Sequence, residues 1–557
     1  MLVWLSLALA DPGAGSDEEK GDRWSLTASD DLEIRYWVRD QRLIDPNDVP
    51  VFNYVEEVNR LNLGASRGKW KLNTQIDQVA LLANRYYLDD VKYVERPLLE
   101  PNRIWSPFGA DADVYANVEK VTLSYESPKA SVQLGDVYAA FGRGIALNVN
   151  RNVDIDIDTS IQGLKVVGRP GPWDLTAIVG QLNRQQVFQD NPNIGLQGDR
   201  RHFVGAVRAE RFGLGPANVG LHGVTYGFVQ ETGLAAGFTD STGPDVVIGG
   251  ATAELIGVGG IDWYAEVDVF DYVGDKLTAG GVELGGAAYA SASFYPGKTV
   301  WLVELKRYVG TNQVNAILSP ELYQVAIAPT LEYERAITED SAAAVGSEDI
   351  WGGRVTMDWA LKPGVFTPYL ACGVFRDLDT ETLHFNTVPE TIVHPMVGVE
   401  WFPGDGAVLV NAGLRNDDRD GTAEGTDRQL HGDVTLNFPL PAGLTGNVNV
   451  GAEHFWWGTN PLQQNDYTEM ESAFTVSRGS KVALTYFTDF STNPLIDSTG
   501  NITEAVYMAT ELQVKPASAL TLKAFYGAYK SGIRCSGGQC RLLPGFEGAR
   551  VSMTGTF

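Results

Sequence analysis

The sequence lacks any apolar run of the about 18 residues that a transmembrane helix requires. It is also short of basic charge, since 43 Lys and Arg residues stand against 70 Asp and Glu residues and give a net charge of -27. A nucleic-acid partner is therefore not expected, because such proteins cluster Lys and Arg where they meet phosphates. The acidic excess fits external loops that bind divalent cations, or a surface charge that only keeps the protein soluble.

Cysteine is equally scarce, with three in 557 residues. Cys372 stands far from the other two and has no histidine close to it in sequence, so a zinc site is not expected. Cys535 and Cys540 enclose the turn-forming sequence Ser-Gly-Gly-Gln between two strand-like runs. We therefore predict a local disulfide between them that staples the tip of a hairpin.

Glycine and aromatic residues are abundant instead, with 61 Gly, 13 Trp, 22 Tyr and 22 Phe, as expected for many strands and tight turns. Apolar and polar residues alternate with the period of a strand, most clearly near residues 482–490 and 506–515. An antiparallel sandwich would alternate too, but the aromatic residues toward strand ends favour a membrane barrel with interface girdles. These aromatics are Trp301, Trp401, Phe402, Phe455, Trp456 and Trp457.

The last strand-like stretch, residues 550–557, places apolar residues on one face and polar residues on the other. A chain that ends on an aromatic residue after such a strand resembles the outer-membrane β-barrels of Gram-negative bacteria. The resemblance implies that Phe557 is the insertion signal and that the barrel assembly machinery reads it. Gly555 departs from this pattern, in which a bulky residue is usual at that position.

Tight-turn sequences recur along the chain, mostly about 40 residues apart, which leaves room for two strands and one longer loop per period. They lie at 127–129, 169–172, 213–216, 258–260, 295–297, 362–364, 402–404, 440–443, 478–480 and 515–517. Taking these turns as periplasmic, and 297–364 as one hairpin with an external loop near 309–348, we predict an all-β, antiparallel up-and-down transmembrane barrel. It has about 24 strands, within a range of 22 to 26, since single-chain bacterial barrels have even numbers. The barrel is expected to occupy residues 31–557.

The N-terminal end has a short apolar run that closes on Ala8-Leu9-Ala10, a pattern typical of a secretory cleavage site. We therefore predict a signal peptide at residues 1–10 and a flexible segment at 11–30. A signal normally starts with basic residues, which are missing here, so Met1 is not established as the true start.

Two further stretches, Gly135 to Ile145 with its Gly-Asp and Phe-Gly-x-Gly segments and Ala328 to Glu332 with Pro-Thr-Leu, carry a second resemblance. They resemble motifs of a family of large outer-membrane β-barrel proteins of unknown function. The resemblance implies a barrel in the outer membrane of a Gram-negative bacterium. It supplies neither an activity nor catalytic residues.

A barrel of this size would leave a wide hole unless something blocks it. We expect no folded plug domain ahead of the first strand, because fewer than about 30 residues are left there after removal of the expected signal peptide. Loops 84–114, 142–159 and 309–348 could fold inward or dock a partner, or they could cap the rim. Arg143, Arg151, Glu511 and Lys515 are the candidates for charged groups that line the lumen or a constriction.

Asp154, Asp156 and Asp158 have a spacing like that of a calcium loop. Isoleucines intervene and Thr159 stands where the turn glycine should be, so calcium is only a weak candidate ligand and alternation in an extended segment is the stronger interpretation. No other cofactor is expected.

The function favoured by these patterns is a channel or transport pore, gated by inward loops or by a lipoprotein or periplasmic plug subunit. The alternative is a non-conducting surface receptor or scaffold that binds a partner protein. An outer-membrane hydrolase is the third hypothesis, although no His-Glu-x-x-His run occurs and we expect no enzyme. Membrane lipid and lipopolysaccharide are the expected surroundings.

Overall fold

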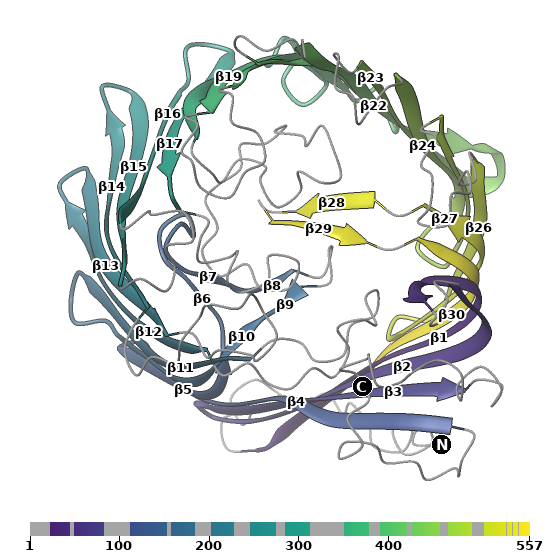
Figure 1. Cartoon of the computed structure of the whole chain (residues 1–557), viewed down its shortest axis with the longest axis horizontal. Coiled ribbons are helices and arrows are strands. Elements are labelled where there is room, and N and C mark those ends of the chain that lie inside the picture. Colours follow the sequence, from purple (N-terminus) through teal and green to yellow (C-terminus); the bar gives the residue numbers. More distant parts are fainter. Residues whose placement is uncertain are drawn as a thin grey trace.

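The computed structural model describes residues 23–44, 50–82, 112–152, 157–183, 202–227, 245–273, 284–311, 350–377, 390–419, 426–456, 466–492, 506–530, 532–536, 539–543 and 545–557. These residues form a closed, 24-stranded antiparallel β-barrel (Figure 1). Each wall strand pairs with the next one along the chain, and β30 closes the ring by pairing with β1, from Ser29 opposite Thr556 to Arg39 opposite Glu547. The predicted fold class and strand count are confirmed.

The first half of the wall consists of β1 (Ser25–Ile44), β2 (Pro50–Arg67), β3 (Trp70–Leu82), β4 (Ala112–Glu126), β5 (Ala130–Val137), β10 (Ser160–Gly168), β11 (Trp173–Asn183), β12 (Phe203–Leu214), β13 (Ala217–Gly227), β14 (Val246–Val258), β15 (Ile261–Tyr272) and β16 (Leu284–Phe294). The second half consists of β17 (Thr299–Val309), β18 (Ile350–Trp359), β19 (Phe366–Asp377), β20 (Glu390–Trp401), β21 (Ala407–Arg419), β22 (Thr426–Leu440), β23 (Leu444–Trp456), β24 (Tyr467–Arg478), β25 (Val482–Ser491), β26 (Val506–Ala517), β27 (Leu520–Tyr529) and β30 (Phe546–Thr556). Three short hairpins pair away from the wall: β6 (Ala139–Ala140) with β7 (Asn148–Val149), β8 (Arg151–Asn152) with β9 (Ile157–Asp158), and β28 (Gly532–Ser536) with β29 (Gln539–Leu543).

One end of the barrel carries the short turns that the sequence predicted. Gly297 and Gly364 adopt φ values of 66° and 71° there, a conformation that favours glycine. The turn predicted at 515–517 begins slightly later, because β26 continues through Ala517, and a further short turn at Gly68 joins β2 to β3. β17 and β18 are one hairpin, as expected, and most of their connection lies outside the described residues.

The outer face of the wall is apolar. Leu370 and Met508 are 51% and 54% exposed, and both alternate with half-buried or buried lumenal neighbours. Trp173, Trp359 and Trp401 lie on the same outer face beside the short turns. An exposed apolar band bounded by aromatic residues is the lipid-facing surface of a transmembrane barrel.

Two expectations about particular residues need correction. Phe455 is not an interface residue, because it is 4% exposed and its ring stacks on Tyr467 at 4.4 Å, on the strand face that it shares with lumenal Glu453. β1 begins at Ser25 rather than at residue 31, so part of the segment expected to be flexible belongs to the wall. The predicted signal peptide and Trp457 lie outside the described residues.

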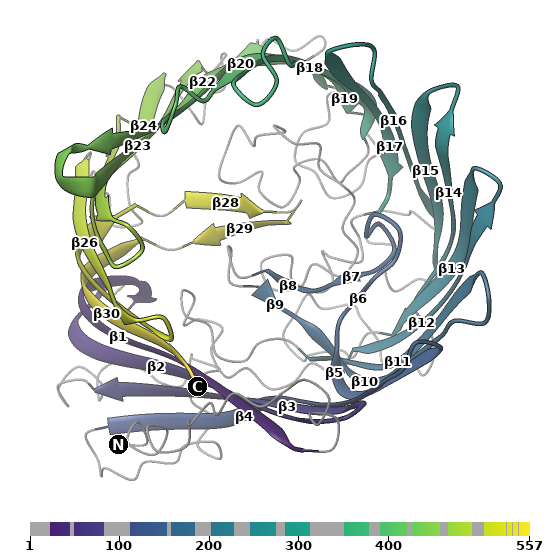
Figure 2. The same cartoon turned by 180° about the vertical axis from the view of Figure 1, so that it is seen from behind.

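The short hairpins lie within the ring when the barrel is viewed along its axis. Figure 1 and the reverse view in Figure 2 show β6 to β9 on one side and β28 with β29 reaching in from the opposite side. The main apolar cluster lies on the inner side of the wall formed by β10 to β19, and residues from the β6–β7 region complete it. The lumen is therefore the region in which to look for function. No helix of the described chain is long and apolar enough to cross a membrane.

Candidate functional site in the barrel lumen

The chain leaves the wall at the end of β5 and enters the lumen as residues 138–152, here called the inward segment. Gly135, just before the departure, has φ 105°, and a Cβ there would lie 1.9 Å from the Val121 carbonyl oxygen. Asp136 follows and accepts bonds from the Val121 amide at 2.8 Å and the Asn183 side chain at 2.6 Å. The Gly-Asp pair thus fixes the point where the chain turns inward.

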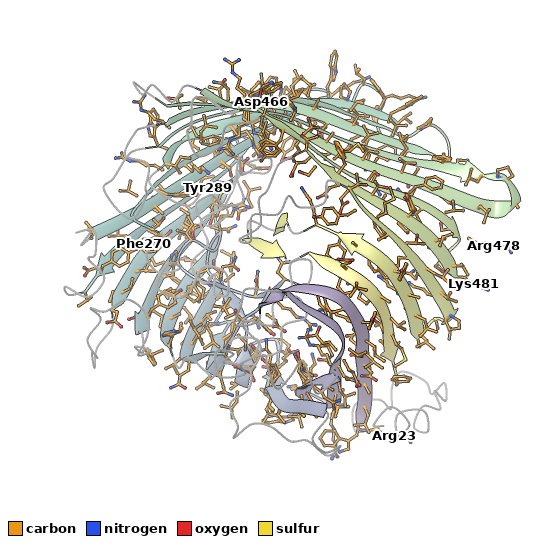
Figure 3. All side chains as sticks on the ribbon, turned by 45° about the vertical axis from the view of Figure 1, so that its right-hand side comes forward. Arg23, Phe270, Tyr289, Asp466, Arg478 and Lys481 are labelled. Carbon is orange, nitrogen blue, oxygen red and sulfur yellow. The ribbon has the colours of Figure 1, made fainter. Side chains whose placement is uncertain are left out.

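The inward segment buries an apolar surface against the wall. Five of its side chains, those of Phe141, Ile145, Ala146, Leu147 and Val149, are between 0% and 1% exposed. They belong to one cluster with wall residues that include Val204, Tyr226, Ile248, Phe270 and Tyr289. Figure 3 shows Phe270 and Tyr289 on this side of the barrel, away from Arg478 and Lys481. Burial of this kind, at about 25 cal/mol per Å² of apolar area, holds the segment in place.

Polar contacts add direction to this packing. The Tyr226 hydroxyl donates to the Ala146 carbonyl oxygen at 2.7 Å, and the Arg143 amide donates to Glu266 Oε2 at 2.7 Å. The Arg143 guanidinium lies 4.9 Å from the ring centroid of Tyr264 and 5.6 Å from that of Tyr289. Arg143, predicted as a lumenal charge, is therefore part of the attachment of the segment to the wall.

A buried ion pair just beyond the segment contacts both of its ends, through Tyr138 and Arg151. Lys120 of β4 bonds the Asp158 carboxylate, and the Tyr138 hydroxyl donates to Asp158 Oδ1 at 2.6 Å. Arg151, the second predicted lumenal cation, lies 3.6 Å from the same carboxylate. Burial opposes ionisation of Asp158, yet these cations and the hydroxyl hold the pKa of Asp158 below its usual range. Burial, together with Asp158, raises the pKa of Tyr138.

A polar cavity of about 1060 Å³ lies between the Lys120–Asp158 ion pair and the short-turn end of the barrel. Its lining includes Lys71, Gln75, Lys120, Thr122, Gln133, Asp136, Arg151 and Lys165. Lys165 also donates to the Tyr138 carbonyl oxygen at 2.7 Å. The cavity therefore combines charges of both signs with neutral hydrogen-bonding groups, as in a water-filled channel.

The predicted charges of β26 lie on the opposite side of the ring. Glu511 faces the lumen, where its carboxylate lies 3.8 Å from Lys523 and 3.9 Å from Arg550. Lys515 shares that strand face but lies near the short turns, where its amide donates to the Lys481 carbonyl oxygen at 2.7 Å. The four predicted lumenal charges are thus split into two pairs and do not form one constriction.

Other predicted site residues have mixed outcomes. Asp154 and Asp156 lie outside the described residues and Asp158 is in an ion pair, so the calcium site stays a prediction. The backbone register of β28 and β29 places Cys535 opposite Cys540, while the disulfide itself stays a prediction. The Phe557 ring lies over Gly555, 2.9 Å from where a Cβ of that glycine would be, so a bulky residue at 555 would collide with the terminal ring.

Two features were missed in the sequence. Residues 64–68, Gly-Ala-Ser-Arg-Gly, fit the Gly-x-Ser-x-Gly pattern, but Ser66 lies in β2 before a tight turn to β3 and no helix follows it.

His222, Glu266 and Asp268 form a buried cluster behind the inward segment. Their only local signal is the Glu-x-Asp spacing, which places both carboxylates on one strand face.

No protein-family model matches the chain, and no curated protein matches it. Among solved structures, the P pilus usher (PapC) translocation pore is similar, with 11% identity, a TM-score of 0.41, and coverage of 95% of this chain and 99% of that one. The outer membrane protein opdK from Pseudomonas aeruginosa has 12% identity and a TM-score of 0.37, covering 74% of this chain and 97% of that one. The siderophore receptor PirA from the same species has 8% identity and a TM-score of 0.42, covering 96% and 80%. The likeness goes no further than the general form of a barrel.

Proposed function

We propose that the chain is an outer-membrane pore of a Gram-negative bacterium, through which solute or polypeptide passes, and that the inward segment gates it. The observation that carries this proposal is the inward segment itself, packed over one side of the lumen beside a polar cavity of about 1060 Å³. A segment held by noncovalent contacts can move without breaking the wall, whose strands are hydrogen-bonded independently of it.

The geometry suggests a direct test by shortening the segment. The Phe141 amide donates to the Leu147 carbonyl oxygen at 2.9 Å, so the two residues that flank 142–146 are already paired. Replacing these five residues with Gly-Gly keeps that pairing, because a two-residue turn closes a hairpin. Single-channel recording in planar bilayers should show a larger unit conductance for this variant than for the unchanged protein.

The matched control is Arg478→Ala, which changes an exposed side chain at the short-turn end and leaves the segment intact. We expect its conductance to equal that of the unchanged protein. If neither the unchanged protein nor the shortened variant carries current, the pore proposal fails and a non-conducting receptor or scaffold is supported instead.

The apolar outer face of the wall and the C-terminal end of the chain suggest what surrounds the protein. Membrane lipid covers the apolar outer band, lipopolysaccharide faces its external part, and the barrel assembly machinery reads Phe557 at the end of β30. A lipoprotein or periplasmic subunit that plugs the lumen is a further proposed partner. Isolation of the chain from native membranes in mild detergent tests it, since a plug should co-purify in stoichiometric amount.

A further inference from the structure

We propose that His222, Glu266 and Asp268 bind a divalent transition-metal cation of the zinc type, which secures the inward segment to the wall. The ligand atoms of the three side chains all lie within 4.8 Å of one another, and the three residues are buried. This site does not depend on the chain being a pore. It lies beneath the segment that the pore proposal assigns as the gate.

The wall is built to bring these side chains together. His222 of β13 and Asp268 of β15 both lie opposite Gly250 of β14, so the three positions form one row across the strands. A Cβ at Gly250 would lie 2.0 Å from Asp268 Oδ1 and 2.3 Å from His222 Nε2. Only glycine therefore leaves the imidazole and the carboxylate room to meet, and they do so at 2.6 Å.

The inward segment covers the row from the lumen side. A Cβ at Gly142, where φ is 54°, would lie 2.2 Å from Glu266 Oε1, so a second glycine is needed at the point of closest approach. Arg143 donates its amide to Glu266 Oε2, and the Phe141 ring centroid lies 5.9 Å from that of His222. The cluster is thus enclosed between the wall and the segment.

Two carboxylate oxygens in this enclosure have no hydrogen-bond partner in the described chain. They are Glu266 Oε1 and Asp268 Oδ2, on side chains that are 0% and 1% exposed. Within the same part of the chain, His222 is the only basic side chain at ion-pair distance from either carboxylate. A buried carboxylate stays ionised only when it is paired with a cation or coordinates a metal, and otherwise it becomes protonated; one cation between these two carboxylates would keep both ionised.

The donor set selects the class of cation. One imidazole nitrogen with two carboxylate oxygens suits zinc and neighbouring first-row ions, whereas calcium and magnesium prefer oxygen donors alone. Tetrahedral zinc with ligands at about 2.0–2.2 Å places neighbouring donor atoms about 3.3–3.6 Å apart. His222 Nε2 and Asp268 Oδ1 are 2.6 Å apart. On zinc loading they would therefore move apart by about 0.7–1.0 Å, and a water would complete the coordination.

The test is zinc binding by the full chain, purified in detergent, stripped with a chelator and reloaded with one equivalent of Zn²⁺. We expect one tightly bound zinc per chain by elemental mass spectrometry, and its loss in Glu266→Gln and in His222→Ala. Glu511→Gln, at a lumenal carboxylate of the opposite wall, and His394→Ala, at the His394–His431 contact of β20 and β22, should retain it. Binding that is absent in the unchanged protein, or that disappears in His394→Ala but not in His222→Ala, overturns the proposal.

Two measurements on the unchanged protein keep the test decisive if the variants do not fold. X-ray absorption at the zinc edge should show nitrogen and oxygen neighbours at about 2.0–2.2 Å and no sulfur. Amide exchange in residues 139–147 should slow by up to about 100-fold at a zinc concentration of a hundred times the dissociation constant, because the ion stabilises the attached state. Zinc with sulfur neighbours, or amide exchange in residues 139–147 that is the same with and without zinc, contradicts the proposal. A proton shared between the two carboxylates then accounts for the cluster.

Discussion

Leu147→Ala is the sharpest perturbation of the inward segment. Leu147 is 0% exposed and belongs to the cluster that joins the segment to the wall. Truncating a buried leucine to alanine costs about 2–5 kcal/mol, because transfer energy is lost and a cavity remains. The wall strands do not depend on this side chain for their hydrogen bonds, so the cost falls on the attachment of the segment rather than on the barrel.

That energy converts into a measurable shift in local opening. At about 1.4 kcal/mol per tenfold, it raises the population in which the segment is detached by roughly 30-fold to 4000-fold. Hydrogen exchange read by mass spectrometry, in protein reconstituted into lipid vesicles, reports this directly. Peptides covering residues 139–149 should exchange faster by that factor, while peptides from the wall should not change.

Two matched variants define the comparison. Leu164→Ala removes the same atoms from the outer face of β10, where the side chain is 37% exposed, and should leave the segment unaffected. Leu147→Met keeps the buried volume and should cost less than about 1.5 kcal/mol. If residues 139–149 exchange no faster in Leu147→Ala than in Leu164→Ala, the packing described here does not hold the segment and the reasoning is refuted.

Three further predictions concern other parts of the chain. The pKa of Asp158 is lowered in the folded protein, so its contribution to stability is complete above the unfolded pKa and is lost as the pH falls through the lower folded value. Hydrogen exchange of the inward segment, followed as the pH is lowered, should therefore show a loss of protection that is absent in Asp158→Asn. The same loss should be reduced in Lys120→Met. Cys535 and Cys540 should be oxidised in protein isolated from the membrane, so that reduction raises the mass by about 2 Da, and alkylation without reduction should label only the third cysteine. The amide and the carbonyl of Phe557 both form hydrogen bonds with Ala28. Removing Phe557 should slow insertion into lipid vesicles, while Phe557→Trp should insert nearly normally. Equal insertion rates for the unchanged protein and both variants would show that the terminal ring is not read.

The wall could be predicted from the sequence because its signals are local. In β26, outward Val506 and Met508 alternate with inward Tyr507 and Glu511, and the side-chain period of two fixes the strand and its faces. Short turns depend on a few adjacent residues, of which Gly297 at φ 66° is an example. Counting turns therefore gives the strand number without any knowledge of distant contacts.

The site could be predicted only in part, because its contacts join residues far apart in the chain. Arg143 contacts Glu266 although 123 positions separate them in the chain, and no sequence pattern near either residue predicts this contact. The loop 142–159 was a candidate for inward folding, and the described part of it does fold inward. The inward position depends on the apolar inner surface of the wall from β10 to β19, whose cluster residues extend from Ile161 to Phe375.

That wall sector leaves a trace in the sequence. In β14, Val246 and Ile248 face inward at 0% and 1% exposure while Val247 faces outward at 41%, so the first part of the strand is apolar on both faces. A water-filled lumen does not favour such residues, whereas β26, with Glu511 inward, shows the ordinary polar lining. A stretch of wall where alternation fails in this way must be covered by an apolar loop, because exposing it to water would cost about 25 cal/mol per Å². The loop that supplies Phe141 and Leu147 meets that requirement, so the break in alternation and the fold of the loop have one physical cause.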